Sequence, residues 1–223
     1  NKSLKKIYLK KNNSDFIIEG ESFDASKIID NIMDSDDENS SIFKSLTSKI
    51  NIKIKKTYID EVNFINNLYG NINYIDNEIE NLKLESTFPN RKKINFFIKT
   101  TNKSETTTRL FTSYPKPLIK RYDFIKGFEE GNLDFYSTKK GEASNSVLVI
   151  DNFKVKEVPI FAKLLSLASL QGIADLLTGE GIRFTDFEMN FSNKKGLTTI
   201  EELYAIGPAV SILMDGYIET KKL

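Results

Sequence analysis

Residues 49–58 read KINIKIKKTY, and this stretch decides the fold class. Ile50, Ile52 and Ile54 alternate with asparagine and lysine. Successive side chains of a β-strand point to opposite faces of a sheet, so the alternation predicts a strand with one apolar face and one polar face. Such a strand either buries its apolar side chains in a core or presents them to a groove.

The same alternation recurs along most of the chain and predicts about ten strands or more. Turn-forming residues separate several of these strands, at Asn67–Asn71, Pro89-Asn90, Lys139–Gly141 and Asn193–Gly196. We therefore expect a mainly β fold, in which serial hairpins build a long, strongly curved and predominantly antiparallel sheet that forms a groove or half-barrel. The other segments with this alternation are Lys5–Lys11, Asp15–Glu21, Glu78–Glu85, Lys93–Thr100, Thr106–Thr112, Asn132–Ser137, Ser146–Val155, Ile182–Phe191, Leu197–Tyr204 and Val210–Ile218.

A few segments instead space their apolar residues as a helix does. Ala25–Met33 follows Asp24, which is a suitable N-cap, and Lys116–Phe124 places its apolar residues on one side. Residues 158–178 predict a helical hairpin, because Pro159 suits a first helical turn and glycines follow the apolar run.

The apolar run Val158–Leu177 is long enough to span a bilayer. Lys163 and Asp175 interrupt it, however, and a charged side chain near the bilayer centre costs roughly 2.5–3.5 kcal/mol on insertion scales. We therefore expect two short helices packed on the sheet. These helices either cap the end of a core or line the mouth of a groove, through Phe161, Leu164, Leu165 and Ile173.

The composition argues against several classes of function. The 223 residues include 32 lysines and arginines and 31 acidic residues, which gives a formal net charge of +1 and no field to attract nucleic acid. The absence of cysteine and histidine removes thiol nucleophiles, disulfides, the commonest general base and the commonest transition-metal ligand. We expect no enzymatic activity, no cofactor, no metal and no nucleic-acid partner.

Paired carboxylates are the one catalytic alternative. The acidic residues of Asp34–Ser41 cluster in a segment without apolar neighbours to desolvate them, and the spacing lacks the glycine and terminal glutamate of an EF-hand loop. The simplest interpretation is a solvated loop. A carboxylate-dependent hydrolase would need an acid pair buried elsewhere, in a pocket.

The second half of the chain resembles the AsmA-like C-terminal region of large AsmA/YhdP-type envelope proteins of Gram-negative bacteria. The resemblance rests on Ile150–Phe153, on VPIFAKLLSLASLQGIADLLTGEGIRF at 158–184, on FEMNF at 187–191 and on GLTTIEELYAIGPAVSILMDGYIE at 196–219. It is strongest over 127–219, and the segment EGESFD at 19–24 is also similar. We therefore expect residues 1–223 to be one AsmA-like segment of a larger protein.

The resemblance implies a periplasmic protein that is anchored to the inner membrane through a segment not in this chain. It implies a bridge-like groove that binds or conducts phospholipid, or another acyl lipid, between the inner and outer membranes. The alternative is an envelope scaffold or outer-membrane assembly factor, in which the same sheet closes into a sealed β core.

Alternation suggests which side chains would line such a groove, although a shift of one residue in register would invert a face. An open groove and a closed core show the same alternation, so both remain possible at this stage. The candidate lipid-contacting residues are Ile50, Ile52, Ile54, Phe96, Ile98, Leu133, Phe135, Val147, Val149, Phe184, Met189 and Phe191.

Overall fold

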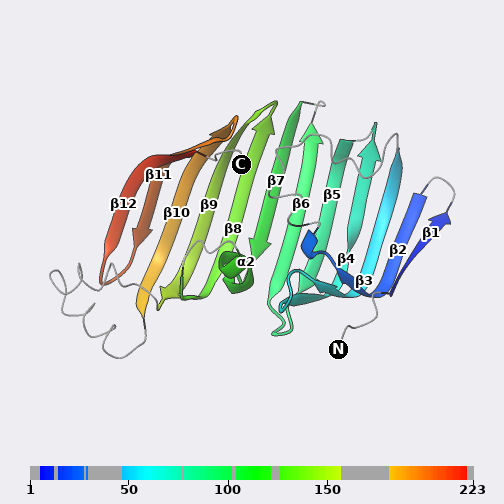
Figure 1. The fold of residues 1–223 in the computed structure, drawn as a ribbon, viewed down its shortest axis with the longest axis horizontal. Helices are drawn as coiled ribbons and strands as arrows, with labels where there is room; N and C mark the ends of the chain where they lie inside the picture. Colours follow the sequence, from blue (N-terminus) through cyan, green and yellow to red (C-terminus); the bar gives the residue numbers. More distant parts are fainter. Residues whose placement is uncertain are drawn as a thin grey trace. The chain divides into compact units, whose positions relative to one another are not determined.

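The computed structural model describes residues 6–12, 15–27, 29, 47–76, 78–101, 104–121, 126–156 and 181–219. Contacts divide the chain into two compact units, Asn1–Leu110 and Phe111–Leu223. In each unit the strands lie in the sheet in the same order as in the sequence (Figure 1). The predicted mainly β fold is therefore confirmed.

The described residues of the first unit form six strands and most of a seventh. The pairs β1–β2, β3–β4, β4–β5 and β5–β6 are antiparallel, as serial hairpins require. The pair β2–β3 is parallel, so the prediction of serial hairpins is wrong at this step. A parallel pair needs a crossover of a dozen or more residues, and residues 25–47 supply that length. The strands are β1 (Lys6–Asn12), β2 (Asp15–Asp24), β3 (Ser48–Tyr58), β4 (Phe64–Ile75), β5 (Glu78–Thr87), β6 (Lys93–Thr101) and β7 (Glu105–Thr112).

The segment Asn67–Asn71 lies inside β4, so its prediction as a turn is wrong. Asn67 has a φ of 54°, and the register between β4 and β5 shifts between Asn66 and Tyr69. A Cβ on Gly70 would lie 1.9 Å from the carbonyl oxygen of Lys83, so the neighbouring backbone comes closer than any side chain allows. These turn-forming residues therefore build a β-bulge and a close strand contact.

The described residues of the second unit form one short helix, α2 (Lys116–Arg121), and five further strands that pair antiparallel throughout. Gly141 and Gly196 both have positive φ in the turns that close two of the hairpins, β8–β9 and β10–β11. Left-handed backbone at such positions favours glycine, so these predicted turns are confirmed. The strands are β8 (Phe128–Lys140), β9 (Ala143–Val155), β10 (Ile182–Lys194), β11 (Leu197–Ile206) and β12 (Ser211–Glu219).

The helix predictions have different outcomes. Helix α2 confirms the prediction at Lys116–Phe124, with an earlier described end at Arg121. Ser26, Lys27 and Ile29 are helical, and the Ser26 N–H donates to the Asp24 carboxylate at 3.1 Å, as an N-cap does. The rest of Ala25–Met33, the acidic segment Asp34–Ser41 and the whole predicted helical hairpin lie outside the described residues.

The sheet is open at both ends. β1 pairs only with β2, and β12 pairs only with β11, among the residues that the structure describes. The alternative of a sheet that closes on itself is therefore wrong for this part of the chain. Within the same residues, no helix is long and apolar enough to cross a membrane.

Candidate functional site

The apolar side chains of the first unit form continuous rows across neighbouring strands. Residues that are partners in register point to the same face of a sheet. One row joins β2 to β6 through Phe16, Ile50, Ile72, Leu82 and Ile98. The next row runs through Ile18, Ile52, Gly70, Leu84 and Phe96. We call the side chains of these two rows, together with Ile54 and Leu68, the first apolar face.

The opposite face of the same strands is mostly polar. Lys53 lies beside Glu19 on one side and beside Tyr69 on the other, and Glu85 continues this row on β5. Glu85 forms an ion pair with Lys83 at 3.2 Å, and hydrogen bonds from Tyr69 and Lys83 lower the pKa of Glu85. The sheet of the first unit thus separates an apolar surface from a charged one.

Burial varies along the first apolar face. Ile50, Ile54 and Leu82 are buried, with 2%, 4% and 6% of their surfaces exposed. Ile52 and Phe96, in the neighbouring row, are only half-buried. Part of this face is therefore packed, and part remains accessible to another apolar molecule.

A second apolar cluster fills the second unit. Phe153 is its centre, because the ring stacks on Phe128 and on Phe184 with centroid distances of 5.2 Å, and meets Phe187 edge-on at 6.3 Å. Its most buried members, Ile150 and Ile182, are 0% exposed. The buried cluster consists of Ile119, Phe128, Leu133, Ile150, Phe153, Val155, Ile182, Phe184, Phe187, Met189, Leu203 and Ala205.

The structure sorts the candidate residues by face. Those of the first unit, Ile50, Ile52, Ile54, Phe96 and Ile98, all lie on the first apolar face. The buried cluster of the second unit contains Leu133, Phe184 and Met189, with Phe135 and Phe191 packed against it. The only candidates that neither surface includes are Val147 and Val149.

Val147 and Val149 lie on the opposite, polar face of β9. Val149 pairs in register with Asp134 and Glu188, and Val147 pairs with Tyr136 and Asn190. Their neighbours Leu148 and Ile150 face the cluster instead, which the alternation did not predict.

A local irregularity explains this inversion. Asn152 has a φ of 52°, and the opposite positions on β8, Glu130 and Gly131, have φ values of 66° and 82°. Phe153 and Ile150 both reach the cluster, although they are three positions apart and strict alternation would place them on opposite faces. The alternation therefore changes phase at Asn152. The adjacent polar pair Asp151-Asn152, between the apolar run Val147–Ile150 and the alternating residues Phe153–Val155, was the available sequence signal.

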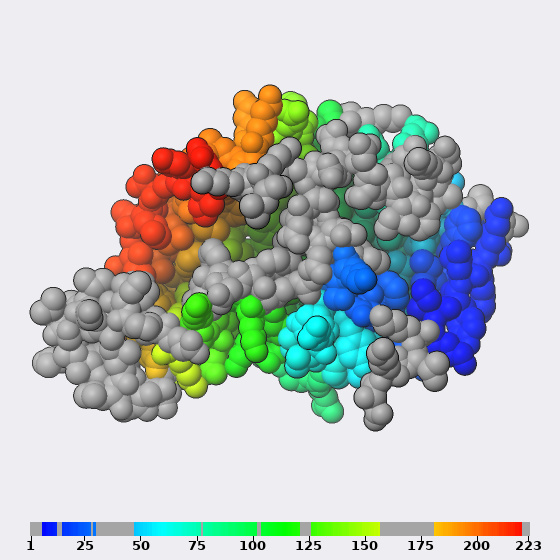
Figure 2. Space-filling view, viewed as in Figure 1, coloured from blue at the N-terminus to red at the C-terminus, as the bar shows by residue number. Residues whose placement is uncertain are grey.

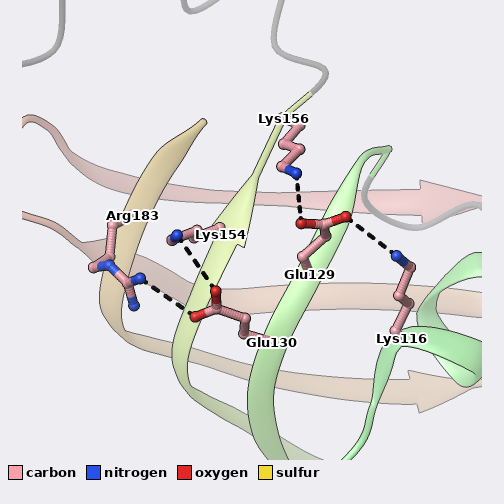
Figure 3. A network of polar contacts seen from close by, with 6 residues as sticks. All are labelled: Lys116, Glu129, Glu130, Lys154, Lys156 and Arg183. Carbon is pink, nitrogen blue, oxygen red and sulfur yellow. Dashed lines mark hydrogen bonds and ion pairs between the residues drawn. The ribbon is translucent and has the colours of Figure 1, made fainter. Parts of the chain in front are cut away.

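Ion pairs connect the ends of neighbouring strands in the second unit (Figure 3). The Glu129 carboxylate lies 2.8 Å from the Lys156 ammonium and 3.2 Å from that of Lys116, which begins α2. Hydrogen bonds from Lys156 and Lys116 hold the pKa of Glu129 below its ordinary value. The carboxylate thus links α2 and the end of β9 to β8.

Glu130 makes the companion bridge to two cations on neighbouring strands. Its carboxylate lies 3.3 Å from Lys154 on β9 and 3.3 Å from Arg183 on β10 (Figure 3). Both carboxylates are therefore engaged by pairs of cations, and the arrangement resembles a structural clamp more than a catalytic pair.

The carboxylate-dependent alternative needs a buried acid pair, and the described residues contain none. None of the described aspartates and glutamates is buried. Where a described glutamate has a shifted pKa, as at Glu19, Glu85, Glu129 and Glu188, the shift is downward, whereas a general acid at neutral pH needs a raised pKa. The described residues also contain no group of three potential metal ligands.

The polar face of the second unit carries a hydrogen-bonded glutamate that yields a test of the register. The Tyr204 hydroxyl donates to Glu188 at 2.7 Å, and the Asn190 amide donates to the same carboxylate at 2.9 Å. The bond from Tyr204 is the largest cause of the lowered pKa of Glu188, and the same contact raises the pKa of Tyr204.

We expect Tyr204→Phe to raise the pKa of Glu188 toward its ordinary value, as measured by an NMR pH titration of the side-chain carboxyl carbon. A carboxyl group whose pKa is lowered in the folded protein stabilises the fold at pH values above its unfolded pKa. This stabilisation is lost as the pH falls through the folded pKa. Because the pKa of Tyr204 is raised in the folded protein, this residue stabilises the fold at pH values below the unfolded tyrosine pKa. That stabilisation is lost as the pH rises through the folded pKa. The difference in stability between the two proteins should therefore be largest at neutral pH. An unchanged pKa of Glu188 would contradict the assigned contact.

Comparisons with known proteins gave no match: no family model, no curated protein and no solved structure is similar to this chain.

Proposed function

We propose that this chain is a non-enzymatic, lipid-binding or lipid-conducting segment of a periplasmic envelope protein that carries phospholipid between the inner and outer membranes. The observation that carries the proposal is the first apolar face, whose rows cross neighbouring strands without a charged side chain from β2 to β6. The open edges of the sheet and the charged opposite face agree with a surface that holds an acyl chain on one side only.

The dimensions of this face suit an acyl chain. Neighbouring strands lie about 4.8 Å apart, so a row from β2 to β6 extends over roughly 20 Å. One leaflet of a bilayer has a hydrocarbon depth of about 15 Å, half of the whole core. Each buried CH₂ group contributes about 0.8 kcal/mol, so a tail in contact with the row could be held without any polar group.

The resemblance to the AsmA-like C-terminal region supports the location. It implies a periplasmic segment, with an inner-membrane anchor outside this chain. A curved sheet would let the half-buried row around Ile52 and Phe96 line a groove while a lipid headgroup stays in water.

Ile52→Glu should reduce the amount of co-purified phospholipid about tenfold or more, because a carboxylate on the apolar row would have to be desolvated by the acyl chain. Ile52 is half-buried and lies opposite Gly70, which has no side chain. Native mass spectrometry and lipid extraction of the purified protein provide the measurement.

Lys53→Glu is the matched control, since the same charge enters the next position of the same strand on the polar face. Circular dichroism and thermal unfolding should show that both variants fold. If the wild-type protein carries no phospholipid, or if both variants lose it equally, the apolar row is not the lipid site.

A second candidate function is a non-transporting envelope scaffold. The complete burial of Ile150 and Ile182 favours it, because these two side chains contact other protein side chains and are not available to a lipid. Wild-type protein that folds and binds its envelope partners without phospholipid would support the scaffold over the lipid carrier.

A further inference from the structure

The two edge strands of the sheet are exposed and opposite in charge. β1 is exposed at all its residues, and β12 exposes 74% of Leu213 and 72% of Tyr217. Both strands lie at the surface of the molecule, β1 in blue and β12 in red (Figure 2). Each has one strand neighbour among the described residues, so each presents backbone N–H and C=O groups to a further strand.

We propose that a second copy of this chain adds its β1 to β12, so that copies associate head to tail through their sheet edges. β1 reads KIYLKKN, with three lysines and no acidic residue, whereas β12 reads SILMDGYIE, with two acidic residues and no basic one. Pairing of β1 with β1, or of β12 with β12, would bring like charges together. Pairing of β1 with β12 brings opposite charges together.

The two strands also match face by face. Ile7 and Leu9 lie on the side of the first apolar face, since they pair in register with Gly20 and Ile18. On β12, Met214 pairs with Leu203 and so lies on the side of the buried cluster. Asp215 points to the other side, as does Lys10 on β1. Ile7 and Leu9 would thus meet β12 on its apolar side, and Lys10 would meet Asp215 on the other side, while Lys11 is the one charged residue of β1 on the apolar side.

An antiparallel register matches both faces from Ile7 to Lys10, whereas Lys11 on the apolar side falls opposite Met214. It places Lys10 opposite Asp215, Lys6 opposite Glu219 and Ile7 opposite Ile218, with Tyr8 beside Tyr217 in the polar row. Lys10 also contacts Glu19 at 3.0 Å, but it remains 64% exposed, and an ammonium with three donors can serve two carboxylates. A contact of this kind is heterologous, so association should continue beyond a dimer.

Charge reversal tests the proposal by sedimentation velocity over a concentration series. The wild-type chain should form species larger than a dimer. The double variant Asp215→Lys/Glu219→Lys should weaken association at least about tenfold, which corresponds to about 1.4 kcal/mol. The matched control Glu78→Lys/Glu80→Lys reverses two exposed charges on an interior strand, and it should associate like the wild type.

A charge swap then separates this contact from non-specific attraction. The variant Lys6→Glu/Lys10→Glu should also lose association alone, and an equimolar mixture of the two edge variants should recover it, because an acidic β1 then meets a basic β12. A wild-type monomer at all concentrations would overturn the proposal, and so would a mixture that fails to recover.

The chain has no cysteine, so single cysteines can locate the contact. A mixture of Tyr8→Cys and Tyr217→Cys proteins should form a disulfide-linked heterodimer under mild oxidation, whereas Tyr136→Cys, an exposed position on β8, should not join either. Faster self-coupling of Tyr217→Cys would indicate a β12–β12 contact and overturn the head-to-tail arrangement. None of these measurements depends on lipid binding.

Discussion

Replacement of Phe153 by alanine is expected to lower the free energy of unfolding of the second unit by about 3–5 kcal/mol. Only 2% of the Phe153 surface is exposed, and the ring lies between Phe128 and Phe184 at 5.2 Å from each. Truncation removes the transfer free energy of the ring and leaves a cavity, which rigid strand neighbours cannot easily fill. Chemical denaturation followed by tyrosine fluorescence would measure the change.

Tyr136→Ala is the matched control for this loss. Tyr136 is also an aromatic residue of a strand in the second unit, on β8, but it is 46% exposed on the polar face. Its removal should cost less than about 1 kcal/mol, as surface substitutions usually do. If the two variants lose similar stability, the cluster around Phe153 is not the core of this unit.

Replacement of Gly70 by alanine should have the largest effect in the first unit, a loss of about 3 kcal/mol. The new Cβ would lie 1.9 Å from the Lys83 carbonyl oxygen, and a backbone atom cannot move aside as a flexible side chain can. The φ of 158° adds strain, because side chains rarely adopt it. Strand β4 would have to move away from β5, which should also accelerate amide hydrogen exchange at their shared bonds.

Gly216→Ala provides the comparison, since a Cβ at Gly216 would meet nothing within 4 Å. Glycine is less favourable than alanine inside a strand, so this variant should be neutral or slightly more stable. A dilute sample avoids any contribution from the proposed association through β12. A Gly70→Ala protein as stable as Gly216→Ala would show that β4 and β5 do not approach each other as described.

Both predictions concern positions that alternation did not identify. Phe153 lies between Asn152 and Lys154 in the sequence, and its burial between two rings depends on β8 and β10, which are separate from it in the sequence. Gly70 lies in a segment whose composition is typical of a turn, and only the approach of Lys83 on the next strand gives it a structural role. Alternation is a property of one segment at a time, whereas both structural roles depend on neighbouring strands.

Among the candidate lipid-contacting residues, alternation likewise predicted some faces correctly and others not. The rows through Ile50, Ile52 and Ile54 were predictable from residues 49–58, because a period of two can form only one kind of amphipathic element. The faces of Val147 and Val149 were inverted, because one residue with positive φ at Asn152 shifts the phase of everything before it. A regular period of two along the sequence does not reveal where the backbone makes such a local change.

The sequence alone determined that the chain is mainly β, where most strands begin and end, and which face of β3 is apolar, because these depend on local periodicity and turn residues. Only the tertiary structure decided that β2 and β3 are parallel, that the sheet stays open at β1 and β12, and that Asn67–Asn71 continues a strand. The physical reason is that pairing direction, edges and bulges depend on hydrogen bonds between segments distant in sequence, and no local pattern encodes the partner.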